Sequence, residues 1–128
     1  VSRMMCEDTP LAADVMERAE SCVSISGLHD LRPILRTEMN HKLALDPVEA
    51  RQESAALKDP HRAARMTAWV GGGERPEFIR QARLLHNVWS GFDVEITLHI
   101  DGTHDHFSVI EGLKYPQSTL TTCFVGND

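Results

Sequence analysis

Three segments of the chain have the pattern of β-strands, because they are rich in apolar and β-branched residues and end at glycine or at turn residues. They cover 21–27, 66–70 and 93–100. The second runs directly into Gly71-Gly72-Gly73, and the third alternates apolar and polar positions before Asp101-Gly102. The pattern therefore predicts three short strands, separated by long connections.

The clearest helical pattern lies between the second and third predicted strands, at 76–89. Apolar side chains recur there at helical spacing, which predicts an amphipathic helix with one face packed on a sheet. That face carries Phe78, Ala82, Leu85 and Trp89, with Arg75, Arg80 and Arg83 off it. Shorter helical segments are predicted at 1–6, 12–19, 31–36, 47–54 (with Asp46 as its cap), 107–113 and 118–124.

Strands that alternate with helices in this order indicate βαβ units and a parallel sheet. We therefore expect an α/β fold of three layers, αβα, with about three parallel strands and flanking helices. In such sheets ligands bind beyond the carboxyl ends of the strands. The first strand is expected to have an open edge, which natural proteins usually cover.

Composition narrows the class of protein. The chain has 128 residues, 41% hydrophobic and 25% charged, which predicts one globular domain over 1–128. A net charge of -6 without a basic stripe argues against nucleic acid or an anionic membrane as partner. There is no long apolar run and no secretion signal, and three cysteines without a C-x-x-C pair predict free thiols and a cytoplasmic location.

Two residues near the predicted strand ends suggest acid–base chemistry. Glu74 follows the second strand and His106 follows the third, so adjacent parallel strands would bring them together. A carboxylate beside an imidazole orients the ring and stabilises its protonated form in hydrolytic triads. The alternative is that Glu74 only favours the start of a helix and that His106 is a loop residue.

An ordered set of motifs resembles the C-terminal half of α/β-hydrolase-fold enzymes, in particular the arylformamidase (kynurenine formamidase) and carboxylesterase group. The motifs are Ser26-Gly27-Leu28-His29-Asp30-Leu31, Val70-Gly71-Gly72-Gly73-Glu74 with Glu77-Phe78, and His106-Phe107 with Val109-Ile110. The resemblance covers nearly the whole chain. It implies that Glu74 is the catalytic acid, where the family usually has Asp, and that His106 is the catalytic base.

The family's nucleophile lies in a Gly-x-Ser-x-Gly elbow and its oxyanion hole uses an upstream His-Gly-Gly motif, and neither occurs in these 128 residues. The resemblance implies that the chain starts just after the elbow, as a truncated or degenerate copy that is nearly inactive alone. The implied partners are the N-terminal half of the same fold, or a self-associating copy, and a small-molecule substrate. The implied reaction is hydrolysis of an ester or of an N-formyl aryl amide.

Other interpretations remain open. The cluster of His99, Asp101, His104, Asp105 and His106 has the residue types of a metal site and includes the common His-x-His ligand spacing, although it does not match the His-x-His-x-Asp-His pattern of metallo-β-lactamase-like enzymes. The glycine run could indicate a phosphate loop, but no phosphate-binding motif is present. For the chain as a whole we expect neither a cofactor nor a metal. Ser24 and Ser26 are expected to pack in the sheet. A catalytically inactive interaction module, which pairs through the open strand edge, is the alternative function.

Overall fold

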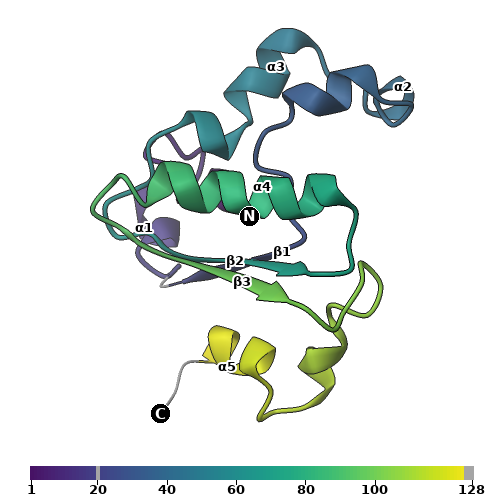
Figure 1. Ribbon diagram of the computed structural model, residues 1–128. Helices are drawn as coiled ribbons and strands as arrows, with labels where there is room; N and C mark the ends of the chain where they lie inside the picture. Colours follow the sequence, from purple (N-terminus) through teal and green to yellow (C-terminus); the bar gives the residue numbers. More distant parts are fainter. Residues whose placement is uncertain (20, 126–128) are drawn as a thin grey trace.

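The computed structural model describes residues 1–19 and 21–125, and its sheet has three parallel strands (Figure 1). They are β1 (Cys22–Ile25), β2 (Arg65–Gly71) and β3 (Glu95–Asp101), in the order β1-β2-β3. Ile25 is in register with Trp69, and Gly71 with Asp101. All three strands therefore end at one edge of the sheet, and the segments that follow them meet there.

Helices cover both faces of this sheet, which confirms the predicted αβα arrangement. Figure 1 shows α4 (Pro76–Trp89) on one face and α5 (Thr119–Val125) on the other. The side chains of β2 alternate between the two faces, as successive residues of a strand must. Ala68 and Val70 pack with α4, whereas Trp69 packs in the cluster that includes Leu120 of α5.

The amphipathic helix α4 forms over the residues predicted for it. Its buried face includes Ala82, Leu85 and Trp89 from the predicted stripe, and also Gln81, which the apolar pattern had not identified. The indole N–H of Trp89 donates to the backbone carbonyls of Ala55 and Lys58, at 3.3 and 3.2 Å. This helix is thus fastened both to the sheet and to the connection between β1 and β2.

The remaining elements are short. Asp46 caps α3 with a complete capping box, as its position before Pro47 predicted. Within residues 1–19 and 21–125, no helix is long and apolar enough to cross a membrane. The elements are η1 (Ser2–Met5), α1 (Ala13–Met16), η2 (Arg32–Arg36), α2 (Asn40–Leu43), α3 (Pro47–Gln52), η3 (Ala55–Leu57) and η4 (Glu111–Lys114).

The helix predicted at 107–113 is wrong. Turns occupy most of this stretch, and only a 3-10 segment forms, at Glu111–Lys114. The side chain of Asp105 caps the first turn, but the next backbone bonds are of the tighter type that ends a helix. Phe107 and Ile110 are exposed, at 86% and 51%, so little apolar packing favours an α-helix here.

Candidate active site

Glu74 lies in the turn between β2 and α4, and its carboxylate points back to the end of β2. The carboxylate oxygen Oε1 accepts a hydrogen bond from the backbone N–H of Gly71, at 2.9 Å. The backbone N–H of Glu74 in turn donates to the carbonyl of Gly71, at 3.2 Å. The Glu74 side chain is fully buried. A short turn therefore fixes a buried carboxylate at the carboxyl edge of the sheet.

His106 reaches the same carboxylate from the loop after β3. Its Nδ1 lies 2.6 Å from Oε2 of Glu74, and its ring stacks on Phe78 of α4, with ring centroids 4.5 Å apart. The imidazole is 47% exposed, and among the described residues Nε2 has no hydrogen-bond partner. The structure thus brings together the two residues that the sequence selected, with one ring nitrogen on the acid and the other open.

The surroundings of Glu74 favour its charged form. Burial alone would raise its pKa, but hydrogen bonds from Ser26, the Gly71 backbone and His106 together hold the pKa below its usual range. The carboxylate is therefore ionised at neutral pH. An ionised acid on Nδ1 keeps the proton on that nitrogen, which leaves Nε2 able to accept one.

Ser26 lies at this site, where we had expected it to pack in the sheet. That expectation holds for Ser24, which is buried in β1, but Ser26 follows the end of the strand. Its hydroxyl donates to Oε1 of Glu74, at 2.5 Å. Because Ser26 binds the acid rather than the open nitrogen of His106, it is not placed as a nucleophile for this pair.

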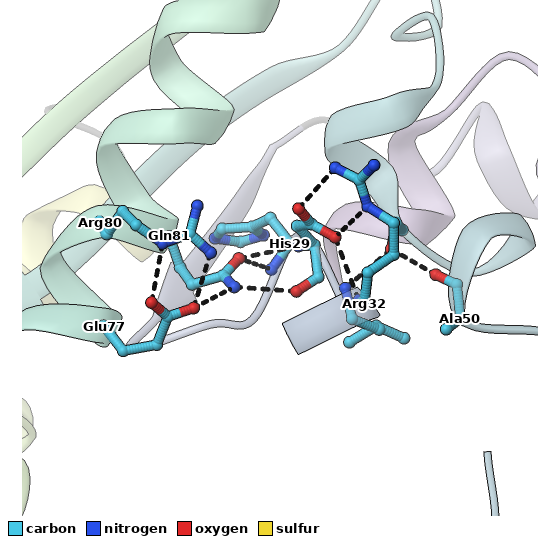
Figure 2. Close-up of polar contacts among 9 residues, drawn as sticks. His29, Arg32, Ala50, Glu77, Arg80 and Gln81 are labelled. Atoms are coloured by element: carbon cyan, nitrogen blue, oxygen red, sulfur yellow. Dashed lines mark hydrogen bonds and ion pairs between the residues drawn. The ribbon is translucent and has the colours of Figure 1, made fainter. Parts of the chain in front are cut away.

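A buried polar network holds the loop after β1 against α4. Figure 2 shows the Gln81 carboxamide oxygen accepting from the backbone N–H groups of His29 and Asp30, both at 2.8 Å. The Gln81 amide group donates to the Asp30 carbonyl and to Glu77, also at 2.8 Å. Gln81 was missed because it is polar, although its helical position between Phe78 and Leu85 places it on the buried face.

The glycine run after β2 permits a close approach of two loops. A Cβ built on Gly71 would lie 2.4 Å from the carbonyl oxygen of His104, a distance that forces the backbone to move. This supports the interpretation of the run as a close turn. The loop that carries His106 thus packs directly on the end of β2.

We predict that Gly71→Ala destabilises the protein by about 2 kcal/mol, because the added methyl group overlaps backbone atoms that cannot rotate away. Gly102→Ala is the matched control, since a Cβ there meets nothing within 4 Å. Urea unfolding measures both. Equal midpoints for the two variants would show that the packing of the loop on β2 is looser than the structure indicates.

The other members of the histidine and aspartate cluster do not converge on one point, and their side chains contact Trp69, one another or nearby backbone N–H groups. His99 stacks on Trp69, with ring centroids 3.7 Å apart, and Nδ1 of His104 lies 2.8 Å from Asp101. Asp105 accepts from backbone N–H groups of its own turn. In the part of the chain that the structure describes, no three His, Cys, Asp or Glu side chains are grouped to hold a metal ion.

Comparison with known proteins gives two similarities over most of the chain. A kynurenine formamidase from Danio rerio is 28% identical over an alignment of 113 positions, which covers 84% of this chain and 39% of that protein. A crystal structure from Silicibacter sp. tm1040, described as a "putative thioesterase", is 38% identical with a TM-score of 0.83 and covers 98% of this chain and 45% of its own. No family model matches. The chain is thus similar to, and spans less than half the length of, each of these two proteins.

Proposed function

We propose that the chain is the acid–base part of a serine hydrolase, with Glu74 as the acid and His106 as the general base. The observation that carries the proposal is the contact between His106 Nδ1 and the buried Glu74 carboxylate, with Nε2 open at the carboxyl edge of the sheet. The similarity to a formamidase and to a "putative thioesterase" supports hydrolysis at a carbonyl carbon. The proposed substrates are carboxylic esters, thioesters included, or N-formyl aryl amides.

In this mechanism His106 moves a proton and Glu74 holds the ring. Nε2 accepts the proton of a serine hydroxyl as the serine oxygen bonds to the carbonyl carbon, and then gives it to the departing alcohol, thiol or amine. Water releases the acyl or formyl group by the same proton transfers. Glu74 keeps Nδ1 protonated and stabilises the imidazolium that forms between the two transfers.

The proposal needs a serine that these residues do not supply. The 128 residues contain no Gly-x-Ser-x-Gly sequence, and Ser26 is bound to the acid. The nucleophile would therefore come from another segment, which must reach the open side of His106. The proposed source is the N-terminal half of the same fold. A second copy of this chain would not supply the serine, because it has the same sequence and therefore no Gly-x-Ser-x-Gly elbow.

The test is hydrolysis of a small panel by the purified gene product, namely an aryl ester, an acyl thioester and an N-formyl anilide, each followed by release of its leaving group. We expect turnover of at least one class well above the rate in buffer. Turnover of none would overturn the proposal and favour the inactive interaction module, whose open β1 edge could then be examined by its association state.

A further inference from the structure

The Glu74 carboxylate has a polar neighbour on the side away from His106. Its two oxygens have different partners. Oε2 contacts the imidazole of His106, and Oε1 accepts hydrogen bonds from the Ser26 hydroxyl and the Gly71 N–H. Ser26 and Gly71 come from the ends of β1 and β2, and His106 from the loop after β3. One carboxylate thus joins the carboxyl ends of all three strands.

The conformation of Ser26 is unusual for its residue type. Its φ is 50°, in the left-handed region that non-glycine residues rarely adopt. Its backbone N–H is held by the carbonyl of Trp69, at 2.8 Å. The next residue, Gly27, is closely surrounded as well, because a Cβ built on it would lie 2.1 Å from Ser24 Oγ. The structure therefore maintains a strained backbone that directs the Ser26 hydroxyl at the acid.

We propose that Ser26 is a positioning residue, which acts through Glu74 by fixing the orientation of the carboxylate that holds His106. The proposal rests on the proposed function. Without the hydroxyl, Oε1 would keep only the Gly71 N–H, and the carboxylate could rotate away from Nδ1. A misplaced acid slows the proton transfers without touching the substrate, so the loss should fall on kcat and not on KM.

The test compares Ser26→Ala and Ser26→Gly with the wild-type protein. Both variants lack the hydroxyl, but glycine adopts a φ of 50° without strain, so it also serves if the alanine variant folds poorly. We expect kcat to fall about tenfold in both, with KM within about twofold. Ser24→Ala is the matched control, since it removes a serine hydroxyl two residues away, inside β1, that makes no contact with Glu74.

A second readout does not depend on catalysis. The Ser26 hydrogen bond lowers the pKa of Glu74, and His106 is the only titratable side chain hydrogen-bonded to this carboxylate among the described residues. Carboxyl-carbon NMR should therefore show Glu74 titrating at higher pH in both Ser26 variants than in the wild type or in Ser24→Ala.

These readouts separate the failure of the two proposals. If the wild-type protein hydrolyses nothing but the Glu74 titration moves as expected, the positioning contact stands and the proposed function falls. If Ser26→Gly keeps wild-type kcat and its Glu74 titrates as in the wild type, the hydroxyl does not position the acid, and the inference is overturned whatever the activity.

Discussion

His106→Ala should lower kcat/KM for the hydrolysed substrate by about 10,000-fold, because the variant has no group to take the proton of the nucleophile. Glu74→Gln should lose nearly as much. Its amide can donate to Nδ1, which favours the tautomer with the proton on the wrong nitrogen. The double variant should be no worse than the single ones, since residues that act as a unit do not give additive losses. Steady-state kinetics on the panel substrate measures these effects.

His104→Ala is the matched control for these variants. It removes a histidine two positions away, whose Nδ1 contacts Asp101 and not Glu74. Its kcat/KM should stay within a few-fold of the wild type. If His104→Ala instead loses as much activity as His106→Ala, the assignment of the base is wrong, and the loop as a whole rather than one imidazole governs the activity.

The second large effect is on folding stability, and it concerns His29. This side chain is 1% exposed, and its Nδ1 lies 2.8 Å from Ser2 Oγ, while its Nε2 is buried with no partner among the described residues. Burial lowers the pKa of His29 to about 4 from an ordinary value near 6.5. The unfolded chain therefore binds a proton at a higher pH than the native protein does.

The stability that His29 contributes is complete above about pH 6.5 and is lost as the pH falls towards 4. We expect the free energy of unfolding to fall by about 3 kcal/mol over this window on account of His29 alone. Urea unfolding at several pH values between 7.5 and 4.5 gives the slope of the free energy of unfolding against pH. His29→Gln should show a distinctly smaller slope, even if it is less stable at every pH, because glutamine does not titrate.

His41→Gln is the control for this measurement, because its side chain is 79% exposed and its loss should leave the slope unchanged. Comparing slopes also removes the contribution of the carboxylates, which titrate in all three proteins alike. Parallel slopes for the wild type and His29→Gln would mean that His29 is not held neutral by the fold.

The sequence predicted the elements that have a strong local pattern. The stripe of apolar residues placed α4 over its observed range, and the three strands lie within about two residues of their predicted bounds. The first strand ends earlier than predicted because Ser26 turns to a positive φ, which the run of small and β-branched residues does not reveal. The helix predicted at 107–113 does not form as an α-helix: of its apolar residues, Val109 is buried, but Phe107, Ile110 and Leu113 are exposed.

The sequence predicted the part of the candidate site that depends only on the order and direction of the strands. Parallel strands place Glu74 and His106 at one edge, and that much follows from the sequence. The roles of Ser26, Gln81 and His29 were not predicted, since they depend on contacts between segments about 30 to 50 residues apart in the chain, such as that of Ser26 with Glu74. Pairings over such separations are set by tertiary packing and have no local signature.

The most direct test of the central claim, that Glu74 and His106 serve a serine nucleophile, is the intact mass of the gene product before and after a fluorophosphonate, which reacts only with activated serines. The account predicts one adduct on the wild-type protein, with the species well above the 14.3 kDa of these residues. It also predicts that His106→Ala labels far more slowly, because its serine is no longer activated. A protein that gains no adduct would contradict the account.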